Sequence, residues 1–169
     1  SEMCIRDRDI LKVILSYDYL WINIRVKGGA YGCMSGFKRN GESFLVSYRD
    51  PHLKRTLEVY QGVPDYIRAF EADEREMTKY IIGTISNKDV PRTPQMQGSI
   101  SKTAYFSNVT EDMLQKERNQ ILGAQKEDIQ KLAALVEAVL SDNQICVVGS
   151  ETAIEKAEDV FMEVKPLIG

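Results

Sequence analysis

The spacing of apolar residues near the start of the chain predicts one amphipathic helix followed by a hairpin. From Asp9 to Ile24, apolar side chains recur at intervals of four and three residues, which is the period of one helix face; they are Ile10, Ile14, Tyr17, Trp21 and Ile24. Two strand-like segments follow, Tyr31 to Phe37 and Ser43 to Tyr48. Between them, Arg39-Asn40-Gly41 supplies an Asn-Gly pair, which is typical of a hairpin turn.

A glycine-rich turn joins this helix to the first strand. We expect Gly28 and Gly29 to end the helix, because glycine adopts the left-handed conformation without a Cβ clash. Gly28, Gly29 and Gly32 are therefore interpreted as residues that set the turn geometry. Arg25 and Tyr31 flank the turn, which can present polar side chains from a rigid base. From residue type alone, Arg25 would be a surface charge and Tyr31 a packing residue.

The middle of the chain carries clear helix start and stop signals. Asp50 and Pro51 favour a helix start, and Pro64 predicts a break before residues 65–70. Asp73 and Glu76 form a predicted capping pair for the next helix. The inward face of that helix is expected to carry Met77, Tyr80, Ile81 and Thr84.

The second half of the chain predicts more helices and one further strand. Helices are expected from Thr93 to about Ser107 and after Thr110, with an interruption at Gly123. One long helix should follow, whose stripe contains Ile129, Leu132, Ala133, Val136, Val139 and Leu140. The apolar run Ile145 to Val148 predicts a strand covered on both faces. Ser150 would cap a last helix that ends near Pro166.

The order of these elements predicts an α+β fold, with helices packed on one face of a mainly antiparallel sheet. Three strands are few for so many helices, and if neighbouring strands are missing, an unpaired strand edge would be exposed. Residues 1–8 do not fit the helical pattern and are interpreted as a non-native or unstructured leader. Residues 9–169 are interpreted as one partial domain.

Composition narrows the possible partners. The formal charge is −3, with 22 basic and 25 acidic residues interspersed, which favours neither nucleic acid nor a membrane surface. No apolar run approaches the roughly 18 residues of a membrane span. Cys4, Cys33 and Cys146 have no metal-ligand or redox spacing, and we expect the latter two to be buried thiols. The chain shows no targeting signal, and a bacterial cytoplasm or an organelle matrix fits these features best.

Several segments together resemble the pitrilysin/insulinase family of inverted-motif zinc metallopeptidases. The similar segments are 19–21, 24–32, 47–51, 56–60, 81–85 and 146–149, and the resemblance covers about residues 10–165. The chain is most similar to the C-terminal part of a presequence-protease-like enzyme. By resemblance, further strands stand upstream of residue 10, so that the domain is expected to be truncated at its N-terminus.

The resemblance implies roles for the two residues that flank the turn. In this family two halves close around an unfolded peptide, and the N-terminal half holds the zinc. The C-terminal half contributes an arginine and a tyrosine, which match Arg25 and Tyr31 here. Arg25 would bind and orient the substrate backbone, and Tyr31 would donate its O–H to the scissile carbonyl oxygen. The implied partners are the N-terminal zinc-binding half of the same polypeptide and an unstructured peptide substrate.

Other candidate sites are weaker. A zinc site needs several His, Cys or carboxylate ligands, and the chain has one histidine, His52, so no cofactor or metal is expected here. Zinc is expected in the missing N-terminal half. Lys27 is expected to be solvated. The glycine-rich turn at Lys27 connects a helix to a strand, whereas a P-loop connects a strand to a helix, so a P-loop is rejected. The acidic groups at residues 73–76 and 111–112 fit the first turns of helices.

Two classes of function remain. The first is a substrate-binding and catalytic-complement domain of a zinc metalloendopeptidase that degrades short unstructured peptides. In that case the chain is part of an enzyme without being one by itself. The second is a non-catalytic structural or scaffold domain of the same superfamily. The presence of both Arg25 and Tyr31 favours the first class, because a scaffold needs neither side chain.

Overall fold

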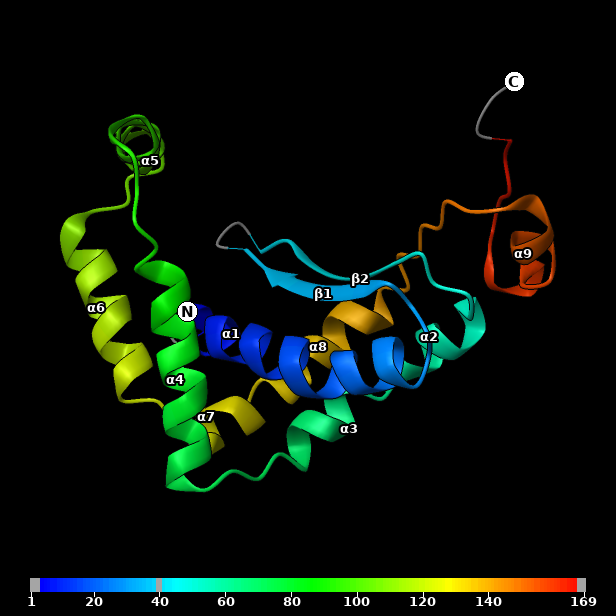
Figure 1. Cartoon of the computed structure of the whole chain (residues 1–169), viewed down its shortest axis with the longest axis horizontal. Coiled ribbons are helices and arrows are strands. Elements are labelled where there is room, and N and C mark those ends of the chain that lie inside the picture. Colours follow the sequence, from blue (N-terminus) through cyan, green and yellow to red (C-terminus); the bar gives the residue numbers. More distant parts are fainter. Residues whose placement is uncertain (1–3, 39–40, 167–169) are drawn as a thin grey trace.

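A long first helix runs through the centre of the molecule. The computed structural model describes residues 4–38 and 41–166. Helix α1 (Cys4–Ile14) continues into two π-helical segments, η1 (Leu15–Tyr19) and η2 (Trp21–Val26). The β1–β2 hairpin lies on one side of this helix, and α7 and α3 lie on the other (Figure 1). The helix begins at Cys4, so residues 4–8 of the predicted non-native or unstructured leader are helical. Residues 1–3 of that leader lie outside the described residues.

The change from α to π geometry rotates the buried face of the first helix. Ile10, Leu11, Ile14 and Leu15 are fully buried at α-helical spacing, and the next fully buried residue is Leu20. Backbone bonds show the wider turn, because the Leu20 N–H donates to the Leu15 carbonyl. The predicted stripe is therefore wrong at two positions: Tyr17 is 66% exposed and Trp21 is 40% exposed.

Among the described residues, the sheet is a two-stranded antiparallel hairpin whose two faces differ in burial. Strand β1 (Gly32–Phe37) pairs with β2 (Ser43–Tyr48), with Gly32 opposite Tyr48. The inner face packs on the core through Cys33, Phe37 and Leu45. The outer face is exposed and carries Met34, Phe44, Val46 and Tyr48. This arrangement confirms the α+β class. Of the predicted hairpin turn, only Gly41 lies within the described residues, and its φ is +89°.

Helices α2 (Leu53–Gln61), α3 (Val63–Arg68) and α4 (Glu74–Lys88) follow the hairpin. The break between α2 and α3 falls before Pro64, as predicted. Asp73 caps α4: its carboxylate accepts from the Glu76 N–H at 2.8 Å, and the Glu76 carboxylate accepts from the Asp73 N–H at 3.0 Å. The first residue of α2 is later than expected, because Pro51 precedes the helix and His52 occupies the cap position.

The long helix predicted after Gly123 is two short helices. Helix α6 (Glu111–Leu122) is capped by Thr110 and ends at Gly123, as predicted. Helices α7 (Lys126–Gln130) and α8 (Ala133–Ser141) then pack separately, and α8 contacts α3. Four of the six residues of the predicted stripe are nevertheless buried, because Ile129, Leu132, Ala133 and Val136 are at most 3% exposed. Val139 and Leu140 are half-buried. The core therefore keeps most of the predicted residues although the helix axis changes.

Two peripheral segments bury few side chains. Helix α5 (Pro94–Phe106) begins at Thr93-Pro94, as predicted, with Thr93 as its cap, but it has no buried residue. Residues 145–148 form no strand, and Val148 is 71% exposed, so the predicted buried strand is wrong. Helix α9 (Glu151–Glu155) has the predicted Ser150 cap but ends early, before a 3₁₀ turn, η3 (Glu158–Val160). Helices α5 and α9 lie at opposite ends of the molecule (Figure 1).

Polar contacts tie the helices around α1. Lys88 at the end of α4 reaches Asp9 of α1 at 2.7 Å and Glu117 of α6 at 3.2 Å. Next to it, Arg118 makes paired hydrogen bonds of 2.6 and 2.7 Å to Asp89. In the part of the chain that the structure describes, no helix has the length and apolar character to cross a membrane.

Candidate functional site

The turn after the first helix is built by two glycines with different tasks. Gly29 has φ +77°, in the left-handed region that favours glycine. Gly28 is limited by space instead, because a Cβ there would lie 2.3 Å from the Ile24 carbonyl oxygen. Gly32 lies in β1, and a Cβ there would meet nothing within 4 Å. Backbone geometry thus explains glycine at 28 and 29, and it does not require glycine at 32.

Backbone hydrogen bonds lock this turn. The Lys27 N–H donates to the Ile22 carbonyl at 2.9 Å, which closes the last π turn. The Gly29 N–H then donates to the Arg25 carbonyl at 2.9 Å, and the Ala30 N–H to the Ile24 carbonyl at 3.1 Å. The chain therefore leaves the helix in a fixed direction, with Ile24 and Ala30 buried on the inside.

Arg25 lies on the exposed side of the turn and stacks on an aromatic ring. Its guanidinium carbon is 4.1 Å from the centroid of the Trp21 ring, within cation–π range. The stack leaves the guanidinium donors free of any described acidic partner while it restricts the side chain. The charge also acts on β1: burial raises the pKa of the Cys33 thiol, and Arg25 partly opposes that increase.

Tyr31 stands at the other end of the turn with its side chain 64% exposed. Its N–H donates to the Tyr48 carbonyl at 3.1 Å, and the two rings meet edge to face at 5.8 Å. The guanidinium carbon of Arg49 lies 5.6 Å from the Tyr31 ring centroid and 5.4 Å from that of Tyr48. The Tyr31 phenol is thus accessible to a ligand and supported from the end of β2.

The segment after β2 forms a rigid base for both residues. One carboxylate oxygen of Asp50 accepts from the His52 N–H at 2.9 Å, and the other accepts from the Thr56 hydroxyl at 2.5 Å. Arg55 donates to the Lys27 carbonyl at 2.8 Å and so joins α2 to the turn. Behind these groups, burial raises the pKa of Tyr60 to about 12. The base is therefore held by polar contacts above an apolar core.

The sequence analysis assigns no functional role to Trp21, Tyr48 or Arg49. A constant helical period predicts Trp21 on the buried stripe, because it does not anticipate the π turn. Tyr48 and Arg49 could have been found from the hairpin register, which places Tyr48 opposite Gly32 and hence beside Tyr31. The predicted pair Arg25 and Tyr31 lies on the same turn, and neither side chain is buried.

The remaining candidates for chemistry are not assembled into a site. No group of three or more His, Cys, Asp or Glu that could hold a metal occurs among the described side chains, those of residues 8–38 and 41–166. His52 is exposed at the start of α2. Of the cysteines predicted to be buried, Cys33 is half-buried and Cys146 is exposed, so that prediction is wrong for Cys146.

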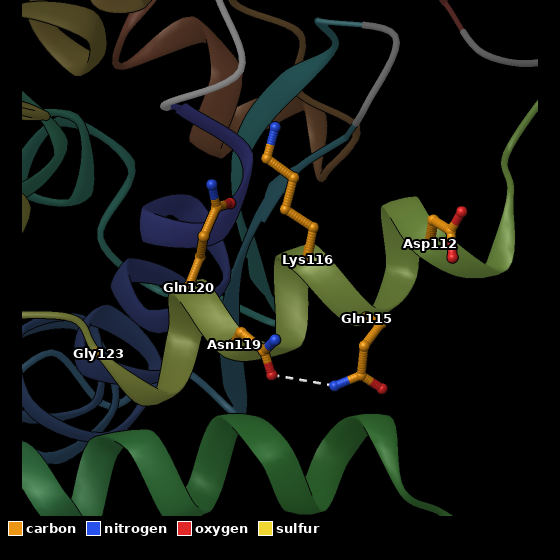
Figure 2. A pocket seen from close by; sticks show the side chains of 6 residues that line it. All are labelled: Asp112, Gln115, Lys116, Asn119, Gln120 and Gly123. Carbon is orange, nitrogen blue, oxygen red and sulfur yellow. Dashed lines mark hydrogen bonds between the residues drawn. The ribbon is translucent and has the colours of Figure 1, made fainter.

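A surface depression of about 500 Å³ lies away from the turn, along α6. Figure 2 shows that its lining side chains project from α6 itself and end at Gly123, with one hydrogen bond, from Gln115 to Asn119 at 2.9 Å. A depression formed by one face of one helix does not enclose a ligand, since binding sites are concave and bring several elements together. The turn with Arg25 and Tyr31 remains the candidate site.

Comparison with known proteins gives relatives across almost the whole chain. Protein HypA of Clostridium perfringens is 48% identical over 159 residues, which is 94% of this chain and 16% of that protein. Presequence protease 1, chloroplastic/mitochondrial, of Arabidopsis thaliana is 34% identical over 155 residues, 89% of this chain and 14% of that protein. The mitochondrial presequence protease of Aspergillus oryzae is 32% identical over 84% of this chain and 14% of its own length.

The chain spans about one sixth to one seventh of the length of these relatives. A family description, the PreP C-terminal domain, matches residues 7–151. This range contains the first helix from residue 7 onward, the turn, the hairpin and helices α2 to α8. The chain therefore belongs to the PreP C-terminal domain family, as the C-terminal part of a presequence-protease-like protein.

Proposed function

We propose that this chain is the substrate-binding and catalytic-complement domain of a zinc metalloendopeptidase that degrades short unstructured peptides. The observation that carries the proposal is the exposed pair Arg25 and Tyr31, on either side of one rigid turn. Membership of a family whose relatives are named presequence proteases supports it. The placement of both residues on one turn, in a chain of this family, favours this role over a purely structural one.

The two side chains suit complementary tasks in peptide hydrolysis. Arg25 is permanently charged and presents several N–H donors, so it can bind carbonyl oxygens of an extended peptide and orient it. Tyr31 can donate its O–H to the scissile carbonyl oxygen as negative charge develops there. The described residues do not fit a zinc site, so the ligands and the metal belong, in this proposal, to an N-terminal half of the same polypeptide.

The proposed partners are that zinc-binding half and the peptide substrate. The interspersed charges and the net charge of −3 offer no surface suited to nucleic acid. Relatives carry mitochondrial or chloroplastic names, and one comes from a bacterium. We accordingly propose a bacterial cytoplasm or an organelle matrix as the compartment.

Tyr31→Phe and Arg25→Ala test this proposal in a polypeptide that joins this chain to its zinc-binding half. Tyr31→Phe should lower kcat/KM about 10²–10³-fold, since it removes one donor to the developing oxyanion and keeps the ring. Arg25→Ala should lower kcat/KM and also raise KM, because the guanidinium binds the peptide before chemistry. Steady-state kinetics on a short fluorogenic peptide would measure both.

Two controls accompany this experiment. Zinc content, measured by elemental analysis, should be the same in every variant, because neither residue is a metal ligand. Tyr105→Phe changes a tyrosine that is 79% exposed on α5 and should leave kcat/KM unchanged. Wild-type rates for both Tyr31→Phe and Arg25→Ala would contradict the proposal and favour a structural or scaffold domain.

A further inference from the structure

Arg49 contacts Tyr31 through both its backbone and its side chain. Its carbonyl oxygen is 3.4 Å from the Tyr31 N–H, next to the shorter bond from that N–H to Tyr48. Its guanidinium carbon is 5.6 Å from the Tyr31 ring and 5.4 Å from the Tyr48 ring. These two rings are themselves edge to face at 5.8 Å. One guanidinium therefore lies near two aromatic rings, beside the turn of the proposed site.

The backbone of Arg49 has an unfavourable conformation for its residue type. Its φ is +49°, in the left-handed region where non-glycine residues are uncommon. Such residues persist only where the surroundings hold them, and they concentrate at functional sites. Arg49 directly follows β2 and precedes Asp50, whose carboxylate accepts hydrogen bonds from the His52 N–H and the Thr56 hydroxyl. The strained residue is thus fixed between the hairpin and the start of α2.

The charge of Arg49 has no acidic partner among the described residues that would explain its placement. The side chain is exposed, and the groups it contacts there are the two tyrosine rings. A phenol that is 64% exposed would otherwise rotate freely about its side-chain bonds. A cation held near the ring restricts that motion, because guanidinium groups are attracted to aromatic faces.

We propose that Arg49 is a positioning residue that holds the Tyr31 phenol in its working orientation. The inference rests on the proposed function, in which Tyr31 acts on the scissile carbonyl. Tyr48 completes the arrangement as the second ring under the same guanidinium. Arg49 itself does not touch the reacting atoms, so its loss should lower kcat and leave KM within about twofold.

Two substitutions separate the side chain of Arg49 from its backbone. Arg49→Ala removes the guanidinium and keeps a Cβ at positive φ, whereas Arg49→Gly removes the guanidinium and relieves the strain. Both should lower kcat by about two- to fivefold, the order expected for losing one cation–π contact between exposed groups. Arg49→Lys keeps a charge near the rings and should recover part of the rate. Arg75→Ala, an exposed arginine on α4, is the matched control and should have no effect.

A double-mutant cycle distinguishes positioning from a general loss of stability. With Phe at position 31 there is no phenol to position, so adding Arg49→Ala to Tyr31→Phe should change kcat by less than about twofold. If Arg49→Ala lowers kcat by the same factor in both backgrounds, or if it has no effect in the wild type, the inference is wrong. If Tyr31→Phe alone keeps the wild-type rate, the proposed function fails instead.

A spectroscopic measurement tests the contact without reference to activity. In fluorine NMR spectra of the chain labelled with 3-fluorotyrosine, the Tyr31 resonance is the one that is missing from the spectrum of Tyr31→Phe. Arg49→Ala and Arg49→Gly should both shift this resonance, and Arg75→Ala should not. A Tyr31 resonance that stays in place in both Arg49 variants would overturn the inference.

Discussion

The two faces of the hairpin differ in burial: the inner face supports the core, and the outer face lies beside the proposed site. The inner face carries Cys33, Phe37 and Leu45 and packs against the first helix. The outer face carries Met34, Val46 and Tyr48, which remain 40–56% exposed, and it continues into Tyr31 and Arg49. Both faces are rich in apolar and aromatic groups, so composition does not distinguish them. The register of the strands and the turn at Gly29 decide which face is buried.

From this difference we expect stability and the proposed function to depend on different side chains of the same short segment. Substitutions on the inner face of the hairpin and in the core it covers should change the free energy of unfolding. Substitutions on the outer face and at the adjoining Tyr31 and Arg49 should leave the fold nearly as stable, and those at the proposed site should change activity. Three further measurements follow from this contrast, beginning with the largest expected effect.

Ile24→Ala should cause the largest loss of stability in this comparison. Ile24 is 1% exposed and precedes the turn, so truncation leaves a cavity that costs about 2–5 kcal/mol of unfolding free energy. Val46→Ala, on the outer face at 40% exposure, should cost no more than about 0.5 kcal/mol. Urea denaturation of both variants would measure the difference, and equal losses would contradict the division of the two faces.

Gly29→Val should lower the free energy of unfolding by about 1–3 kcal/mol, because a β-branched residue is strained at φ +77°. The matched control is Gly32→Ala. Gly32 lies outside the left-handed region, and a Cβ at this position would have no atom within 4 Å, so its substitution should be nearly neutral. Thermal unfolding would compare them. An unchanged melting temperature in Gly29→Val would mean that the turn forms without the left-handed residue.

The smallest expected change in unfolding free energy occurs at alkaline pH and concerns the buried Tyr60 of α2. Burial raises the pKa of Tyr60 to about 12, so the folded state favours its neutral form. Its contribution is fully present below the unfolded pKa of about 10 and is lost as the pH rises from there toward about 12. Tyr60→Phe removes this contribution, and its unfolding free energy should therefore fall less steeply than that of the wild type between about pH 9.5 and 11 in urea titrations. Parallel curves for the two proteins would contradict a raised pKa at Tyr60.

Local signals along the chain predicted the parts of the fold that depend on neighbouring residues. Local signals predicted several features correctly: the capping pair Asp73 and Glu76, the helix start at Thr93-Pro94, the caps Thr110 and Ser150, and the hairpin strands. Each depends on hydrogen bonds or dihedral angles within a few residues, so the sequence contains the necessary information. The position of Arg25 and Tyr31 on either side of a sharp turn is of the same kind.

Tertiary packing decided the features that a local pattern cannot specify. The π turn between Leu15 and Leu20 turned Trp21 outward, where it supports Arg25. Residues 145–148 have the apolar pattern of a strand but no paired strand among the described residues, because strand formation needs a partner backbone. The contact of Arg49 with Tyr31 joins two segments that the hairpin brings together. The sequence thus determined the turn and its two polar residues, and only the tertiary structure decided what holds them in place.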